Sequence, residues 1–163
     1  WVGMLSNIQV HAKPFEGFWM KKAYMVPKDE PNGNESPDSL ATNMEPISVM
    51  NVRSIFVSPE PNQIIKVGEQ TDVQGVAFDG GYGITKVELS ADSGKTWLPA
   101  QLDPDLGKYS WRRWHYNFTA SQKGNYNLHV KATNAKGQTQ PLQQWNRSGY
   151  MRNEIEILPL KAE

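Results

Sequence analysis

Residues 49–160 alternate short apolar runs with turn-forming residues, and this pattern is typical of an antiparallel β-sandwich. The clearest period of two begins at Tyr126, where apolar residues alternate with polar ones as far as Ala132. Helix is scarce, because only residues 1–10 have room for a helical turn or two, and a strand fits there equally well. The predicted strands span residues 54–58, 71–78, 84–90, 96–102, 109–118, 126–132 and 152–158.

The pattern also assigns faces within two strands. In the third predicted strand, Thr85, Val87 and Leu89 are expected to share one face, because side chains alternate along a strand. In the closing strand, Ile155 and Ile157 are expected to face inward.

Three local motifs add detail to the sandwich. The glycines of residues 79–83 predict a tight turn, since glycine adopts positive φ without steric cost. Pro99 indicates an edge strand, because proline cannot donate to a sheet ladder. The sequence Gly124-x-Tyr126-x-Leu128 resembles the tyrosine corner of immunoglobulin-like domains. An all-β, immunoglobulin-like sandwich of about seven strands follows.

The chain before the sandwich divides in two by composition. Residues 1–27 are apolar and aromatic, whereas residues 28–48 hold three prolines and five acidic residues. The second stretch has little to bury and is expected to be a connector that runs over the surface. The predicted organisation is therefore a leading segment at 1–27, a linker at 28–48 and a sandwich at 49–160.

Composition then narrows the classes of partner and chemistry. Lys and Arg number 17, as do Asp and Glu, so there is no net field to attract nucleic acid or acidic lipid. No apolar run approaches the ~18 residues of a membrane span. Cysteine is absent, which excludes disulfides, thiolate metal sites and a cysteine nucleophile.

Titratable residues do not suggest a catalytic or metal site. His11, His115 and His129 lie far apart in sequence, whereas metal sites need several converging ligands. Glu154 and Glu156 share one strand face, where a solvated surface is the expected environment. No catalytic residue and no metal ligand is predicted.

The aromatic strand carries more information. Trp111 and Trp114 are three apart and are expected on opposite sheet faces, one in the core and one exposed. An exposed Trp beside Arg112 or Arg113 favours a partner contact, because Trp and Arg are enriched at binding hot spots. All four are interface candidates, with core packing and the stacking of a sugar or other ligand as the alternatives.

The loop at residues 143–153 is polar, aromatic and basic. Its Arg147 and Arg152 have the forked donors that bind an oxyanion. The alternative is a solvated or structural role, which is common for arginines in loops.

Several motifs, in order, resemble the C-terminal dimerisation domain of sulfite oxidase-type molybdenum enzymes. They are the segment at residues 74–97, Trp111-Arg-Arg-Trp114, the segment at residues 131–141 and Trp145-Asn-x-x-Gly149-Tyr-Met-Arg-Asn153. The last four residues lean toward the bacterial sulfite and sulfane dehydrogenase branch. Trp1-Val2 and Phe18-Trp-Met20 look like the tail of the family's molybdopterin domain, so residues 1–27 are expected to be a remnant of it.

The resemblance implies a role for this chain within a larger enzyme. It would form a homodimer through the sandwich and pack against its own upstream molybdopterin domain. The parent would use molybdopterin-bound molybdenum to oxidise sulfite or a related sulfur oxyanion and pass electrons to a haem or cytochrome, in the periplasm. The family's molybdenum-ligating cysteine is not in this chain, so the fragment alone is expected to be inactive and to hold no cofactor.

One departure from the family concerns the substrate pocket. Animal and plant members carry W-N-L-R-G, whose arginine reaches toward that pocket; here Ser148 takes its position and Arg147 is the neighbour. The rim of the pocket is therefore hypothesised to include Trp145, Asn146 and Arg147, without assigning the family arginine's role to Arg147.

Two other classes of function compete with this interpretation. A free-standing adhesion or carbohydrate-binding sandwich would gather its exposed aromatics in a groove. A complete small enzyme would need a convergent catalytic set, which the sequence lacks. If the chain is a dimerisation domain, the apolar side chains of its leading segment are expected to pack on the sandwich or on a second chain. They are Phe15, Phe18, Trp19 and Met20.

Overall fold

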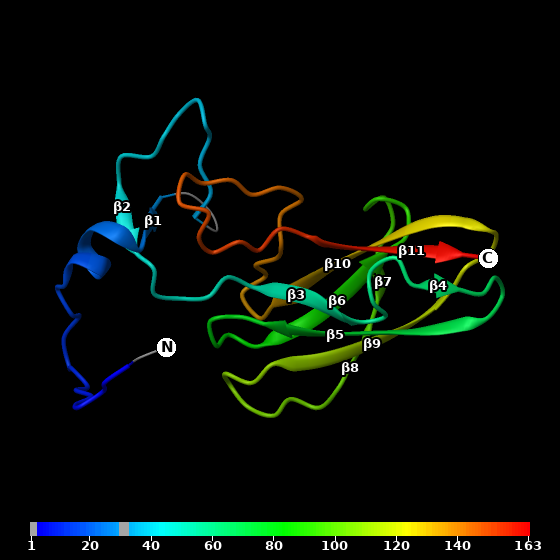
Figure 1. The fold of residues 1–163 in the computed structure, drawn as a ribbon, viewed down its shortest axis with the longest axis horizontal. Coiled ribbons are helices and arrows are strands. Elements are labelled where there is room, and N and C mark those ends of the chain that lie inside the picture. The colour runs from blue at the N-terminus through cyan, green and yellow to red at the C-terminus, as the bar shows by residue number, and fades with distance from the viewer. Residues whose placement is uncertain (1–2, 30–32) are drawn as a thin grey trace.

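Two packed β-sheets form the body of the protein in this computed structural model, which describes residues 3–29 and 33–163 (Figure 1). One sheet has the order β4-β11-β10-β6-β7, and the other has the order β3-β5-β9-β8. Neighbouring strands are antiparallel except for the parallel pair β4–β11. The strands are β3 (Arg53–Ser58), β4 (Ile64–Ile65), β5 (Gln70–Phe78), β6 (Ile84–Ser90), β7 (Leu98–Pro99), β8 (Gln101–Leu102), β9 (Arg112–Thr119), β10 (Gly124–Asn134) and β11 (Glu156–Ala162).

The residues before the sandwich lie beyond one of its ends. A five-residue π-helical turn, η1 (Trp19–Ala23), precedes a small antiparallel pair, β1 (Met25–Pro27) and β2 (Met44–Pro46). In Figure 1 the connector and the loop before β11 lie side by side at this end, away from the C-terminus. No described helix is long and apolar enough to cross a membrane.

The predicted sandwich is confirmed, whereas neither alternative for residues 1–10, a helical turn or a strand, holds for the part that the structure describes. Residues 3–10 form neither helix nor strand, and the helical turn comes later, at η1. The Trp1-Val2 motif lies outside the described residues. The predicted strand at 96–102 is split, because β7 pairs with β6 in one sheet and β8 pairs with β9 in the other. Pro99 does lie on an edge strand.

Two predicted faces are corrected by the register of the strands. Thr85 is exposed because a bulge intervenes, with Thr133 opposite Lys86 and Asn134 opposite Ile84. Ile157 is 54% exposed because it lies opposite His129 on the outer surface.

The inward positions of β11 follow a different phase from the one predicted. Leu158 lies opposite the buried Leu128, and Leu160 and Ala162 continue the inward face. Ile155 is buried as expected, but it precedes the strand, so its side chain does not fix the alternation within β11.

The tyrosine corner is present. The Tyr126 hydroxyl donates a hydrogen bond to the Gln122 carbonyl at 2.9 Å and accepts one from the Gln122 amide at 3.2 Å. The Tyr126 ring also packs edge-on against Phe118. This contact ties the start of β10 to the turn before it, as in immunoglobulin-like sandwiches.

Trp114 is the largest side chain in the core, and Gly75 makes room for it. The two residues are opposite each other in the β5–β9 pair, and the Trp114 ring packs edge-on against Phe56. A Cβ at position 75 would lie 2.1 Å from Trp114 Cζ2 and 2.3 Å from the Ile55 carbonyl oxygen. The sandwich therefore requires glycine at this position for steric reasons, although the backbone there is ordinary.

We expect Gly75→Ala to lower the free energy of unfolding by about 3 kcal/mol, because the added methyl group meets a buried ring and a backbone carbonyl. Urea unfolding followed by tryptophan fluorescence measures the change. Gly3→Ala is the control, since a Cβ there has no heavy atom within 4 Å. Equal losses in the two variants would contradict this account of the core.

Candidate functional site

The loop before β11 is shaped by the side chain of Asn146, which is buried. Its amide nitrogen donates to the carbonyls of Gly33 and Tyr150, at 3.0 and 2.9 Å. Its oxygen accepts from the backbone amides of Ser148 and Tyr150, at 3.1 and 3.3 Å. Asn146 therefore closes the turn and at the same time fastens it to the connector, more than 100 residues away in sequence.

Arg147 is held by Glu35 of the connector. Its Nε and Nη2 donate to Glu35 Oε1 and Oε2 at 3.0 and 2.8 Å, and Nη2 also donates to the Ala41 carbonyl at 2.6 Å. The Glu35 carboxylate accepts two further bonds, from the backbone amides of Arg147 and Ala41, and its side chain is only 1% exposed. We call this arrangement of Glu35, Arg147 and Ala41 the connector clasp.

The clasp keeps Glu35 ionised. Hydrogen bonds from the Arg147 side chain are the largest cause, and with the backbone donors they lower the pKa of Glu35 from 4.5 to about 2. The same pairing raises the pKa of Arg147. Because Nε and Nη2 already bind a carboxylate, an oxyanion approaching this side of Arg147 would compete with Glu35.

Trp145 presents its ring at the surface beside the clasp. Its backbone is fixed by Asn34 and Glu35, while its side chain is 41% exposed. It lines a hollow of about 230 Å³ together with neighbouring loop residues, namely Gln144, Asn146, Gly149, Tyr150 and Arg152. Arg152 is paired with Glu154. The predicted rim residues Trp145, Asn146 and Arg147 thus share one loop. The side chains of Asn146 and Arg147 are engaged in hydrogen bonds that hold the loop, whereas the Trp145 ring faces outward.

A ladder of aromatic rings extends this surface onto the leading segment. Phe18 packs edge-on against Trp19 at 5.3 Å, Trp19 stacks on Tyr24 at 5.6 Å, and Tyr24 contacts Tyr150 at 5.5 Å. Phe18 and Trp19 remain about 60% exposed. The apolar side chains of the leading segment are therefore partly packed on one another and still offer a large contact surface.

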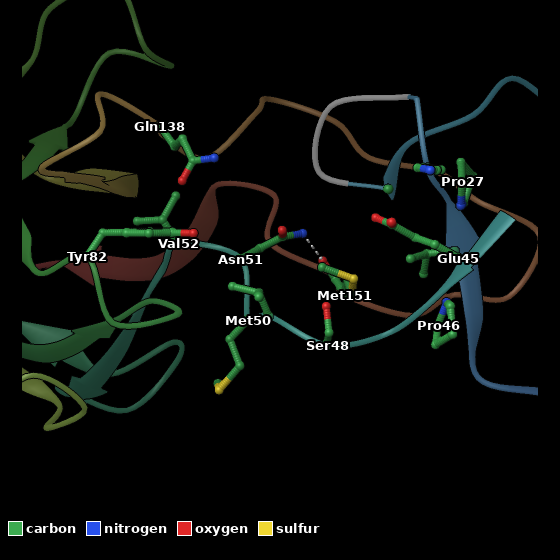
Figure 2. A pocket seen from close by; sticks show the side chains of 14 residues that line it. Pro27, Glu45, Pro46, Ser48, Met50, Asn51, Val52, Tyr82, Gln138 and Met151 are labelled. Carbon is green, nitrogen blue, oxygen red and sulfur yellow. Dashed lines mark hydrogen bonds between the residues drawn. The ribbon is translucent and has the colours of Figure 1, made fainter. Parts of the chain in front are cut away.

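A polar hollow of about 230 Å³ separates the β1–β2 pair from the sandwich (Figure 2). Asn51 donates to the Met151 carbonyl at 2.9 Å across one wall, and Glu45 and Ser48 lie along the β2 side in Figure 2. This bond ties the segment between β2 and β3 to the loop before β11, and the connector clasp ties the connector to the same loop.

The four interface candidates lie on or directly before β9, and they divide between its inward and outward faces as the alternation of side chains requires. Trp114 is 1% exposed and packs in the core, so it offers no contact surface. Trp111 is 56% exposed and stacks on Phe78 at 5.2 Å. Arg113 points outward and pairs with Asp103, and the mostly buried Arg112 pairs with Asp105.

The remaining titratable candidates form no shared site. Glu154 pairs with Arg152, and Glu156 pairs with Arg53. Within residues 3–29 and 33–163, no group of three or more His, Cys, Asp or Glu side chains comes together as metal ligands would. Glu35 was not predicted, because it is one of five acidic residues in the connector and no local motif distinguishes it.

Comparison with known proteins places these features in context. The sequence profile of the Mo-co oxidoreductase dimerisation domain matches residues 44–156. The sulfite oxidase of Arabidopsis thaliana is 34% identical over 109 residues, covering 66% of this chain and 26% of its own length. The mitochondrial sulfite oxidase of Drosophila melanogaster is 26% identical over 98% of this chain and 30% of its own length.

Two further similarities are one of sequence, to a nitrate reductase, and one of structure, to a sulfane dehydrogenase. The NADH nitrate reductase 1 of Oryza sativa subsp. japonica is 30% identical over 66% of this chain and 13% of its own length. The solved structure of the sulfane dehydrogenase SoxCD from Paracoccus pantotrophus has a TM-score of 0.67 at 21% identity, covering 91% of this chain and 37% of that chain, and this likeness shows a shared fold. The chain spans about a quarter to a third of the sulfite oxidases that it matches.

The clasp generates a pH-dependent stability. The pKa of Glu35 is lowered on folding, so its ionised form stabilises the folded chain. This contribution to the free energy of unfolding is complete above pH 4.5 and is lost as the pH falls toward about 2. Glu35→Gln should remove this part of the acid sensitivity, measured as the free energy of unfolding in urea between pH 2 and 6. Glu16→Gln, which breaks only an exposed pair with Lys21, is the matched control. An acid profile unchanged by Glu35→Gln would refute the assignment.

Proposed function

The chain belongs to the Mo-co oxidoreductase dimerisation domain family, and from this premise we propose that it is the assembly module of a sulfite oxidase-like molybdenum oxidoreductase. The observation that carries the proposal is the family match over residues 44–156, which includes β2 and the sandwich as far as the first residue of β11. In this role the sandwich joins two copies of the protein as a homodimer. The end that bears the connector clasp packs against the domain that holds the cofactor.

The surface at the clasp end supports the second contact. Phe18, Trp19 and Tyr24 of the ladder are exposed and end on the half-buried Tyr150, and Trp145 is exposed on the same loop as the clasp. Aromatic residues of this kind anchor protein interfaces. The matched regions make up only 26% and 30% of the two sulfite oxidases, which leaves room in such proteins for a partner domain.

The molybdenum cofactor belongs elsewhere in this proposal. The chain has no cysteine, so it has no thiolate for molybdenum, and the described residues bring together no alternative set of metal ligands. When bound in the parent protein, the cofactor would supply the two-electron redox chemistry. The residues of this chain would position that domain and set the geometry of the dimer.

For the parent we propose oxidation of sulfite or a related sulfur oxyanion, with electrons passed to a haem or cytochrome. The support is the sequence Tyr150-Met-Arg-Asn153, which resembles the bacterial sulfite and sulfane dehydrogenase branch, together with the similarity to sulfite oxidases. The same resemblance supports a periplasmic location. Within this scheme Trp145 reaches the rim of the substrate pocket, while Asn146 and Arg147 hold its loop in place.

The assembly role predicts a dimer in solution. Sedimentation velocity of the 163-residue chain at 1–100 μM should show a species of about 37 kDa, twice the 18.4 kDa chain mass. A chain that remains monomeric over this range would contradict the dimerisation part of the proposal.

The division of labour predicts that the chain alone neither binds molybdenum nor oxidises sulfite. Metal analysis of the purified chain after incubation with molybdate, and a sulfite assay with cytochrome c as acceptor, should both give background values. Stoichiometric molybdenum, or turnover above a heat-denatured control, would mean that the redox centre lies in this chain.

A further inference from the structure

The hollow between the β1–β2 pair and the sandwich gathers polar side chains from segments far apart in the sequence (Figure 2). Glu45 projects from β2 on one side, and Tyr82 and Gln138 project from the sandwich on the other. Val26 and Val52, both buried, form part of its apolar wall. A cleft that combines a few polar groups with an apolar wall is the usual form of a small-molecule site.

The hollow carries one positive and one negative side chain on the same face of the β1–β2 pair. Val26 lies directly opposite Glu45, and Lys28 follows two residues after Val26, so the three side chains share one face. Among the described residues, Lys28 and Glu45 are the charged residues that line the hollow, and they form no ion pair with each other or with another described group. A ligand that has no net charge, but has one group of each sign, matches this arrangement.

The sandwich side of the hollow presents a hydrogen-bond donor whose direction is fixed. Gln138 Oε1 accepts a hydrogen bond from Asn134 Nδ2 at 2.9 Å. Asn134 is only 2% exposed and also donates to Asp79. Because Asn134 holds the oxygen of the Gln138 amide, the amide nitrogen is turned toward the hollow, where no described residue accepts from it (Figure 2). The Tyr82 hydroxyl lies on the same side, so two donors are available there for a carboxylate.

The volume of the hollow sets the size of the ligand. A space of about 230 Å³ holds about eight water molecules at about 30 Å³ each. A molecule with about eight non-hydrogen atoms therefore fills it. An α-amino acid with a short apolar side chain, such as valine, has this size.

We propose that the β1–β2 hollow, as we name this site, binds a free α-amino acid with a short apolar side chain. The ammonium group of the ligand faces Glu45, and its carboxylate accepts hydrogen bonds from Gln138 Nε2 and the Tyr82 hydroxyl. Lys28 supplies the positive charge that balances this carboxylate. Charged groups at both ends make these hydrogen bonds stronger than neutral ones. The site uses neither the dimer nor the cofactor domain, so binding is measurable in the chain alone.

NMR spectra of the nitrogen-labelled chain, titrated with L-valine, test the proposal. The side-chain amide signals of Gln138 and the backbone signals of Val26 and Glu45 should shift saturably, with a Kd of about 1 mM. Two ligands of similar shape separate the contributions of the charges. Isovalerate lacks the ammonium group and isobutylamine lacks the carboxylate, and each should bind at least about 10-fold more weakly than valine.

Two variants test the residues that define the site. Glu45→Gln removes the negative charge with little change in size and should weaken valine binding about 10-fold. Gln138→Glu keeps an oxygen that accepts from Asn134 but replaces the donor nitrogen, and it should weaken binding by a similar factor. Glu60→Gln, in the segment between β3 and β4, is the matched control and should leave the affinity unchanged. Circular dichroism checks that each variant is folded.

Three results would overturn the proposal. They are equal affinity for valine and isovalerate, an unchanged affinity in folded Glu45→Gln, and the absence of saturable shifts with about 20 mM valine. The comparison of ligands uses the unmodified chain, so it decides the question even if a variant fails to fold. None of these results bears on the assembly role, which sedimentation measures separately.

Discussion

The packing of Trp114 against Gly75 is the constraint on which the rest of the sandwich depends. The ring occupies the space where a Cβ at position 75 would lie, so β9 and β5 have one orientation relative to each other. Because side chains alternate, an inward Trp114 directs Arg113 and His115 outward, and an inward Gly75 does the same for Val76. The buried core and the outward face of the four-stranded sheet are therefore two results of one steric requirement.

The opposite end of the molecule is organised by polar contacts rather than by packing. Glu35 and Arg147 hold the connector on the loop before β11, and Asn146 closes that loop from within. Gln140 adds a link between the two sheets, since its buried oxygen accepts from the amides of Ser54 and Ala132. Such directional bonds give the loop one conformation.

Much of the fold could be predicted from the sequence because its determinants are local. Period-two alternation located most strands, and three-residue spacing separated Trp111 from Trp114. The failures have a common cause: Thr85 and Ile157 face outward because of pairing with β10, which no local pattern of β6 or β11 contains. The connector clasp joins residues 112 positions apart, so it too required the fold.

The strands that end each sheet bear on how copies can associate. Three of the four edges of the described sandwich, β4, β7 and β8, are only two residues long. A short edge leaves little unpaired backbone on which a strand from another molecule can add, so growth of the sheets into filaments has little template. The short edges thereby disfavour the addition of strands from other molecules along the sheet, which is the route by which open-ended aggregates grow.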